Sequence, residues 1–381
     1  MDRPEYIKRI SFAFEVTPIV AILGPRQSGK TTLARMFART LEQDTVTHFD
    51  LEDPTHLARL DAPKLALQDL HGIVIIDEVQ RTPGIFEVLR VLVDREHNRA
   101  RFLILGSASR DLIKQSSETL AGRIGHMELT PFSLTEVGVG KLKSLWQKGG
   151  YPPSYLAKSE AISAAWRDAY IATFLERDIP ALGISIPPVA LRRFWMMLAH
   201  YHGQLINYSE FGRSFGASDH TIRRYLDLLE ATFMVRQLAP WYENIKKRQV
   251  KSPKIYIRDS GLFHSLLGIK DSQAMKFHPK LGPSWEGFAI EEIIRKHHAR
   301  ESECFFWSTH GRAELDLLIV KEGKRLGFEV KYTDSPRATR SMITALRDLK
   351  LDELTVVYPG DETFPLTSDI RASGLSKLIG V

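Results

Sequence analysis

The stretch Gly24-Pro25-Arg26-Gln27-Ser28-Gly29-Lys30-Thr31 decides the fold of this chain, because it fits the pattern G-x-x-x-x-G-K-[ST] without a substitution. An apolar run from Ile19 to Leu23 precedes it, and a segment with helical periodicity from Thr32 to Thr40 follows it. In a strand, loop and helix of this kind, inward-facing backbone N–H groups and the helix N-terminus attract phosphate oxygens. The sequence therefore predicts a nucleotide site.

The residues of this loop have predicted places around a bound ATP and its Mg²⁺. We expect the Lys30 ammonium to reach the β- and γ-phosphates and the Thr31 hydroxyl to bind the metal ion. The residues predicted to bind the nucleotide are Gly24, Pro25, Arg26, Gln27, Ser28, Gly29, Lys30, Thr31 and Thr32. The alternative is a glycine-rich turn without a ligand, which the strand and helix on either side disfavour.

A second apolar run, Gly72 to Ile76, ends in the acids Asp77 and Glu78. A continuous apolar run is typical of a strand buried on both faces of a parallel sheet, and ligands bind outside the carboxyl ends of such strands. We expect Asp77 to hold the Mg²⁺ shell and Glu78 to orient and deprotonate the water that attacks the γ-phosphate.

A third strand, Phe102 to Leu105, ends at Gly106-Ser107, and two arginines follow it. It resembles the sensor strand of AAA+ ATPases, which would place Ser107 near the γ-phosphate. Arg110 and Arg123 are candidates for an arginine finger that acts on a neighbouring subunit. Surface salt bridges are the equally weighted alternative for both arginines.

The combination of these motifs resembles a widespread prokaryotic family of AAA+ ATPases with a C-terminal domain of unknown function. The resemblance covers essentially the whole chain, and it is carried by GPRQSGKTT, IVIIDEVQR, FLILGSAS, LAGR, Gly149-Gly150-Tyr151-Pro152 and Leu175-Glu176-Arg177-Asp178-Ile179. It implies an oligomeric ATPase, with a hexamer among the options.

The composition indicates a multidomain protein of the cytoplasm. A chain of 381 residues predicts two to four domains of roughly 100 to 150 residues. Cys304 is the only cysteine, which excludes an intrachain disulfide and fits a reducing compartment. No apolar run approaches the roughly 20 residues that span a bilayer, and the first residues do not resemble a signal peptide. The net charge of +6 permits an anionic partner.

The middle of the chain predicts a helical lid and then a winged helix-turn-helix. Helices are clearest at 161–175 and 189–201, and two more, 208–215 and 219–231, flank a short turn. Strands at 233–238 and 255–257 would form the wing. The residues predicted to contact DNA are His220, Thr221, Arg223 and Arg224 on the second helix, and Lys246, Lys247, Arg248, Lys251 and Lys254 at the wing tip. A protein-packing module with a solvated loop is the alternative.

The last hundred residues predict the order α-β-β-β-α-β. A hairpin centred on Glu322-Gly323 pairs Val320 with Arg325 and places Asp316 opposite Glu329. Strand alternation would put Asp316, Glu329 and Lys331 on one face, and Leu315, Leu317, Phe328 and Val330 on the other. Glu286 shares the apolar side of the preceding helix, where a carboxylate favours a cation partner.

This arrangement resembles the PD-(D/E)xK nuclease core, which Holliday junction resolvases share. The matching residues are Asp316 and Glu329-Val330-Lys331, with Glu286 as the helical acid. The resemblance implies that Asp316 and Glu329 hold Mg²⁺ and that Lys331 steadies the attacking hydroxide or the phosphate. A structural salt bridge, or a decayed nuclease that only grips DNA, is the alternative.

The predicted fold class is α/β: an AAA+ ATPase core (1–133), a helical lid (134–203), a winged helix-turn-helix (204–270) and a PD-(D/E)xK restriction-endonuclease-like domain (271–381). We expect an ATPase that binds and remodels branched, forked or single-stranded DNA in recombination or repair, as a helicase or branch-migration motor. The alternatives are a slow nucleotide switch that gates a DNA- or protein-binding module, and a metal-dependent nuclease regulated by ATP.

Overall fold

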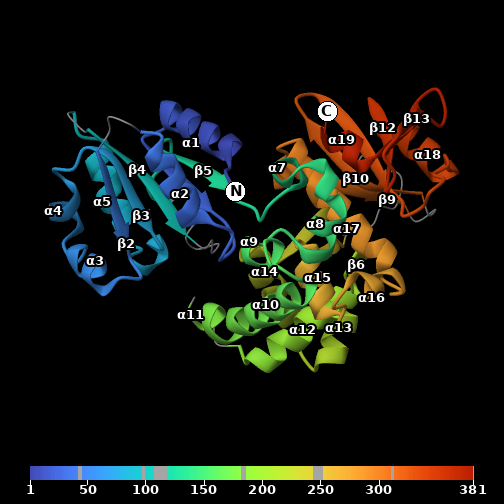
Figure 1. Ribbon diagram of the computed structural model, residues 1–381, viewed down its shortest axis with the longest axis horizontal. Coiled ribbons are helices and arrows are strands. Elements are labelled where there is room, and N and C mark those ends of the chain that lie inside the picture. The colour runs from blue at the N-terminus through green and yellow to red at the C-terminus, as the bar shows by residue number, and fades with distance from the viewer. Residues whose placement is uncertain are drawn as a thin grey trace. The chain divides into compact units, whose positions relative to one another are not determined.

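The computed structural model describes residues 1–41, 45–96, 99–106, 118–181, 186–242, 252–309 and 313–380. These residues divide into two compact units, which are coloured from blue to red along the chain in Figure 1. Unit 1 is Met1–Pro131 with Ala231–Phe233, and unit 2 is Phe132–Glu230 with Met234–Val381. No helix in these ranges is both long and apolar enough to cross a membrane.

Unit 1 is built on a five-stranded sheet whose neighbouring strands are all parallel. The strand order is β2-β3-β4-β1-β5. The strands are β1 (Ile19–Leu23), β2 (Val46–Asp50), β3 (Gly72–Asp77), β4 (Ala100–Gly106) and β5 (Ile124–Glu128). The helices are α1 (Pro4–Val16), α2 (Lys30–Arg39), α3 (Pro54–Arg59), α4 (Pro63–Leu67), the 3-10 turn η1 (Val79–Arg81) and α5 (Ile85–Val93).

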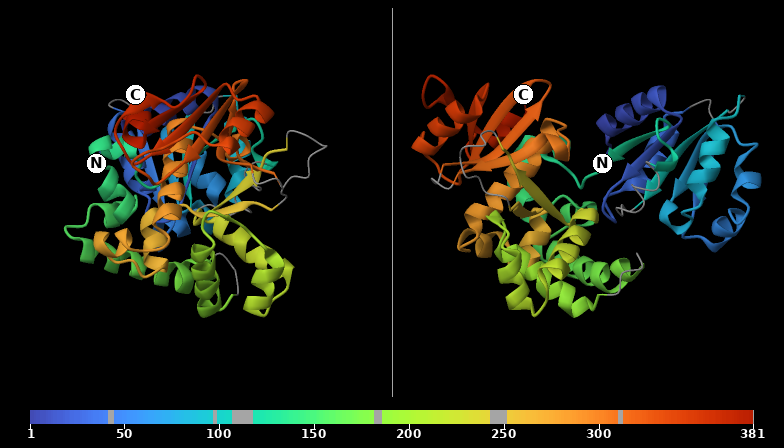
Figure 2. Two further views of the ribbon diagram at one scale, coloured as in Figure 1. Left: turned by 90° about the vertical axis from the view of Figure 1, so that its right-hand side faces the viewer. Right: turned by 180° about the vertical axis from the view of Figure 1, so that it is seen from behind.

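Helices cover both faces of this sheet, as Figure 2 shows from behind. Successive residues of β1 point to opposite faces, so Val20 packs with Phe14 of α1 and Phe37 of α2, whereas Ala21 packs with Phe86 of α5. Every residue of β1 is buried, because both faces of a parallel sheet are covered. The continuous apolar runs of β1 and β3, on which the sequence prediction rested, follow from this burial.

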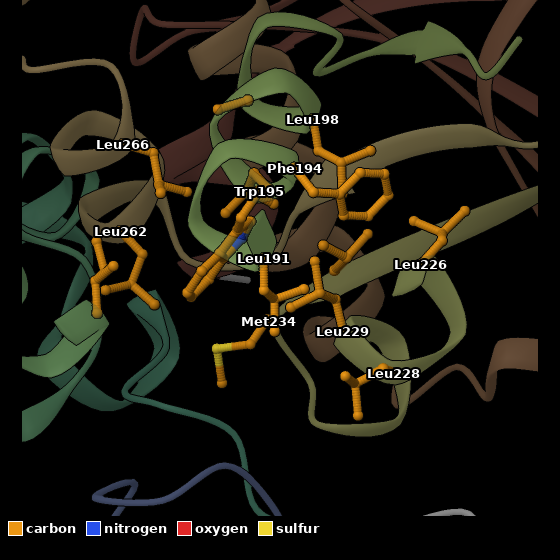
Figure 3. Close-up of a cluster of buried hydrophobic side chains, with 14 of the residues drawn as sticks. Leu191, Phe194, Trp195, Leu198, Leu226, Leu228, Leu229, Met234, Leu262 and Leu266 are labelled. Atoms are coloured by element: carbon orange, nitrogen blue, oxygen red, sulfur yellow. The ribbon is translucent and has the colours of Figure 1, made fainter. Parts of the chain in front are cut away.

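Unit 2 begins with helices that surround an aromatic and leucine-rich core. They are α7 (Leu134–Val137), η2 (Val139–Lys141), α8 (Leu142–Lys148), α9 (Pro152–Tyr155), α10 (Glu160–Thr173), the π-helical η3 (Phe174–Asp178), α11 (Ile179–Ala181), α12 (Pro188–His200), α13 (Tyr208–Phe215) and α14 (Asp219–Ala231). Trp195 of α12 lies fully buried between leucines of α14 and α15 (Ser260–Leu266), as Figure 3 shows.

The remaining strands form one nine-stranded mixed sheet, in the order β13-β14-β12-β11-β10-β9-β7-β8-β6. They are β6 (Gln204–Leu205), β7 (Val235–Pro240), β8 (Lys254–Ile257), β9 (Cys304–Ser308), β10 (Glu314–Lys321), β11 (Lys324–Val330), β12 (Glu353–Tyr358), β13 (Thr363–Pro365) and β14 (Ile370–Gly374). Short parallel pairing of Ala239 and Pro240 with Phe305 and Phe306 joins β7 to β9. The sheet therefore runs across the boundary that the sequence predicted at residues 270 and 271.

Helices cover the two faces of the C-terminal part of this sheet. Buried residues of α17 (Leu281–Lys296) and α19 (Leu375–Gly380) pack on one face, and those of α18 (Arg340–Leu349) pack on the other. Two short elements, α16 (Ser272–Lys276) and η4 (Glu301–Glu303), complete the described structure. The predicted order α-β-β-β-α-β is present from α17 to β12, and β13, β14 and α19 follow it.

The pairing of β10 with β11 has the predicted register, with Val320 opposite Arg325 and Leu317 opposite Phe328. The prediction that Leu315 shares a face with Leu317 was wrong. A register shift against β9 lies between Leu315 and Leu318, so Leu315 packs with the α18 side and Leu317 with the α17 side. The irregularity falls at Asp316, whose Oδ2 accepts a hydrogen bond from the backbone N–H of Val330 at 2.9 Å.

Glu291 of α17 is a buried anion that ties the helix to the hairpin strands. Its Oε1 lies 2.5 Å from Nε of Arg236 on β7, and its Oε2 lies 3.5 Å from Arg258, the residue that follows β8. Burial opposes ionisation, but the guanidinium groups of Arg236, Arg258 and Arg295 outweigh it and lower the pKa of Glu291 to about 2.

Replacing Glu291 with glutamine should destabilise unit 2 by about 3 to 5 kcal/mol, because it leaves buried guanidinium groups without their carboxylate. All six tryptophans of the chain lie in unit 2, so urea unfolding followed by tryptophan fluorescence measures this unit. The control is Glu353→Gln, which breaks a half-exposed pair with Arg371 and should cost under about 1 kcal/mol. Equal losses in both variants would contradict the assignment.

The same residue predicts a pH dependence of the unfolding free energy. A carboxyl whose pKa is lowered by folding stabilises the folded state above its unfolded pKa, near 4.5, and this contribution is lost as the pH falls toward 2. The parent should therefore lose stability across this window more steeply than Glu291→Gln, as measured by urea midpoints at successive pH values.

Candidate functional site

The phosphate-binding loop joins the end of β1 to the start of α2. Gly29 precedes α2 with φ 97°, a left-handed conformation that favours glycine. Lys30 is buried, and its Nζ donates to the carbonyl oxygens of Gly24 at 3.0 Å and Pro25 at 2.9 Å. The ammonium is thereby held inside the loop, where the β- and γ-phosphates of a nucleotide are expected.

The structure brings Thr31 and Asp77 together across the sheet edge. Thr31 stands in the first turn of α2 and Asp77 is the last residue of β3, yet the Thr31 hydroxyl lies 2.5 Å from Oδ2 of Asp77. The contact arises because parallel strands end at the same edge. A hydroxyl and a carboxylate oxygen are ligands that Mg²⁺ accepts, so this pair fits the ion that the sequence predicted.

Glu78 follows Asp77 in a left-handed conformation, with φ 56°. Its carboxylate accepts a hydrogen bond from Nε2 of Gln80 and lies 3.8 Å from Arg26 of the phosphate-binding loop. Arg26 also pairs with Glu52 at 3.2 Å. The predicted base is therefore beside the loop, and two neighbouring side chains hold it there.

Arg3 is a residue of the nucleotide site that sequence reasoning missed. It is buried, and it donates hydrogen bonds to the backbone oxygens of Ser28 at 3.1 Å and Thr130 at 2.9 Å. Arg3 therefore connects the start of α1, the phosphate-binding loop and the segment after β5. No motif identifies it, because a lone arginine ahead of a helix has no distinguishing pattern.

Of the predicted sensor serine and the two candidate finger arginines, only Arg123 lies within the described residues. Ser107 and Arg110 lie outside the described residues. Arg123 makes two hydrogen bonds to the carboxylate of Asp94, at 2.6 and 2.9 Å, and both side chains are partly exposed. In the structure Arg123 thus forms the surface salt bridge that was the alternative to a finger.

The side chains of α14 that were predicted to face DNA are largely exposed. His220, Arg223 and Arg224 are exposed and Thr221 is half-buried. The guanidinium of Arg223 lies over the ring of Tyr208 on α13, 3.6 Å from its centroid. Arg192 and Arg193 on α12 and Arg213 on α13 are also exposed. These helices therefore present five arginines to solvent, together with the acids Glu210 and Asp219.

The predicted wing residues Lys246, Lys247, Arg248 and Lys251 lie outside the described residues. Lys254 is described, and its prediction as a DNA contact was wrong. Its side chain is only 6% exposed and pairs with the carboxylates of Glu286, Glu314 and Asp316. Side chains alternate between the two faces of β8, and this alternation points Lys254 toward these carboxylates. A count of basic residues in a loop does not reveal this direction.

The quartet predicted from the nuclease resemblance does come together. Oδ1 of Asp316 lies 3.4 Å from Nζ of Lys254, and Oε1 of Glu329 lies 2.8 Å from Nζ of Lys331. The Tyr256 hydroxyl donates to Glu286 at 2.6 Å. We call Glu286, Glu314, Asp316 and Glu329 the acid cluster.

The acid cluster combines carboxyl groups of raised pKa with the ammonium groups of Lys254 and Lys331. Burial and then the charge of Asp316 raise the pKa of Glu286 to about 7 and that of Glu329 to about 8. Burial disfavours the charged form of Lys254, but Asp316, Glu286 and Glu314 outweigh it and raise its pKa.

The donor set does not fit the predicted Mg²⁺ site of Asp316 and Glu329. Both oxygens of Asp316 are engaged, by Lys254 and by the backbone of Val330. In the described part of the chain, no group of three or more histidine, cysteine, aspartate or glutamate side chains is arranged to hold a metal ion. Oε2 of Glu329 is buried without a hydrogen-bond partner, but a Mg²⁺ ion held by both carboxylates would have to share the oxygens of Asp316 with Lys254 and the Val330 N–H.

Comparison with known proteins supports the prediction of an ATPase domain in the N-terminal part of the chain. Residues 16–138 match the AAA domain family. Residues 139–273 match a domain of unknown function, DUF8612, and residues 281–378 match another, DUF4143. An uncharacterized protein of Mycobacterium tuberculosis is 49% identical over 372 residues, which span 98% of this chain and 83% of that protein.

Two solved structures are also similar to this chain. The Walker-type ATPase of Pyrococcus abyssi has a TM-score of 0.47 at 14% identity and covers 70% of this chain and 95% of its own. The Thermotoga maritima RuvB Holliday junction branch migration motor has a TM-score of 0.31 at 20% identity and covers 62% and 90%.

Two substitutions test the nucleotide site. Lys30→Ala removes the ammonium from the loop and should lower ATP turnover by roughly a hundredfold or more. Glu78→Gln should keep ATP bound and stop its cleavage, because the amide preserves the shape but accepts no proton. Equilibrium binding of a fluorescent ATP analogue and phosphate release separate the two effects. Lys64→Ala, an exposed change on α4, is the control, and parental hydrolysis in both site variants would refute the assignment.

Proposed function

The chain belongs to the same family as the Mycobacterium tuberculosis relative, and from this premise we propose that it hydrolyses ATP to remodel DNA. Its N-terminal unit contains an AAA-type ATPase domain. The single observation that carries hydrolysis is the 2.5 Å contact between Thr31 and Asp77, beside the buried Lys30. The proposal extends this ATPase to a DNA partner through unit 2.

Each residue of the nucleotide site has a role in the proposed reaction. Lys30 binds the β- and γ-phosphates, and Thr31 and Asp77 provide oxygens for Mg²⁺, which screens the phosphate charge when bound. Glu78 takes the proton of the attacking water. Gln80 donates to Oε2 of this carboxylate, so Oε1 is the oxygen proposed to receive the proton.

The exposed arginines of α12, α13 and α14 support the DNA half of the proposal. Five of them, Arg192, Arg193, Arg213, Arg223 and Arg224, come from helices that share one hydrophobic core. Arginine is suited to phosphate because its planar guanidinium donates in a fork. Asparagine and glutamine, which read adenine edges, are absent from α14, so the proposed contact is with the DNA backbone.

We propose that the DNA partner is branched, forked or single-stranded and that the active protein is a homo-oligomer. A helicase or branch-migration motor is the finer form of this proposal. The second candidate is a slow nucleotide switch that gates a DNA- or protein-binding module. The hydrogen bond from Gln80 to Glu78 favours the switch, because a base held by its neighbour slows turnover.

ATP turnover measured with single-stranded, duplex and four-way-junction DNA separates these candidates. A motor's turnover should rise many-fold with its preferred DNA, because the two functions are coupled, whereas a switch's should stay near the basal rate. Polyglutamate, added at the same concentration of negative charge as the DNA, is the control for stimulation by any polyanion. Turnover that does not respond to any DNA, in a protein that binds DNA, would contradict the motor and leave the switch.

Removing Arg223 and Arg224 together should weaken DNA binding and its salt dependence. Each lost phosphate contact flattens the slope of log K against log salt by about 0.9. The matched control removes two exposed arginines from α18, Arg340 and Arg347, and should leave the slope unchanged. Fluorescence anisotropy with two unrelated sequences checks both the slope and the expected indifference to base sequence. A double variant with the parental slope would place the DNA contact elsewhere.

A further inference from the structure

Lys254 is a buried lysine at the centre of the acid cluster. It is the first residue of β8, and its backbone is paired on both sides, with Leu238 of β7 and Leu205 of β6. Its Nζ lies 3.4 Å from Asp316, 3.8 Å from Glu286 and in contact with Glu314, and 5.7 Å from the centre of the Phe306 ring. The carboxylates come from α17 and β10, so the ammonium joins three elements that are distant in the chain.

We propose that the Lys254 ammonium is the resident cation of the acid cluster, in the place where the resemblance predicted a metal ion. The cluster then holds the hairpin β7–β8 against α17 and β10 without Mg²⁺ and does not cleave DNA. Divalent ions bind there only when the ammonium is removed. This inference concerns unit 2 and is independent of the proposed ATP-driven function.

The engagement of the carboxylate oxygens supports this assignment. With Lys254 in place, Oδ1 of Asp316 accepts a hydrogen bond from the ammonium and Oδ2 accepts one from the Val330 N–H. Oε1 of Glu329 pairs with Lys331, and Oε1 of Glu286 accepts from Tyr256. Mg²⁺ binds through one or two carboxylates with water in its other positions, and the Lys254 ammonium already lies among the carboxylates of Glu286, Glu314 and Asp316.

Lys331, the lysine of the predicted nuclease pattern, does not serve as this central cation. Its side chain is 45% exposed and pairs with Glu329, two residues before it on β11, which ends at Val330. Lys254 is 6% exposed and reaches three carboxylates from a different strand. The difference offers a matched pair of substitutions, because each removes one ammonium from the same cluster.

The test is Mn²⁺ binding to the nucleotide-free full chain, measured by electron paramagnetic resonance of the free ion. Lys254→Met should gain a Mn²⁺ site that the parent lacks at Mn²⁺ concentrations at least roughly tenfold higher, because it removes a positive charge from among the carboxylates. Asp316→Asn added to Lys254→Met should abolish the gain. Lys254→Arg should bind as the parent does, because a guanidinium restores the cation, and Lys331→Met should change binding less than Lys254→Met.

The parent alone also decides the question if Lys254→Met does not fold. Mn²⁺ binding to the parent should be the same as Mn²⁺ binding to Asp316→Asn. Supercoiled plasmid incubated with the parent and Mg²⁺ should remain intact. An Asp316-dependent Mn²⁺ site in the parent, as tight as in the lysine variant, would overturn the proposal. Refolding of Lys254→Met on addition of Mn²⁺, followed by tryptophan fluorescence, would support it, since the metal then replaces the ammonium.

Discussion

The parallel pairing of β1, β4 and β3 is the constraint on which the nucleotide site depends. It brings the ends of β1 and β3 to one edge of the sheet, although β4 lies between them. Thr31 and Asp77 meet for this reason, and Glu78 reaches Arg26 for the same reason. The burial of the sheet on both faces keeps these strands apolar, so the polar groups of the site come from the strand ends, the phosphate-binding loop and the first turn of α2.

Unit 2 is organised by a different constraint, the pairing of buried charge. Glu291 binds arginines from β7 and the end of β8, and Lys254 binds carboxylates from α17 and β10. A buried charge without a partner is costly, so these contacts fix the hairpin β7–β8 against α17 and β10. The β7–β9 pairing is only two residues long, and these ion pairs reinforce the junction that it makes.

The sequence predicted where β1, the phosphate-binding loop, α2 and β3 lie, because the signals for these elements are local. The glycine-rich loop and the acids after an apolar strand require only neighbouring residues and strand direction, and the Glu322-Gly323 hairpin required only a turn and alternation. The errors share one cause, which is contact between distant segments. The register shift beside Asp316 depends on pairing with β9, the burial of Lys254 depends on α17 and β10, and the role of Arg3 depends on where α1 packs.

These errors also show how the basic character of the chain should be interpreted. The net charge of +6 counts lysines and arginines that bind carboxylates inside the protein as well as those that face solvent. Lys254, Arg236 and Arg258 neutralise buried acids, and Arg123 pairs with Asp94. An external polyanion can meet only exposed groups, and five exposed arginines, Arg192, Arg193, Arg213, Arg223 and Arg224, lie on α12, α13 and α14, which share one hydrophobic core. The arginines of these helices, rather than the overall charge, carry the argument for a nucleic-acid partner.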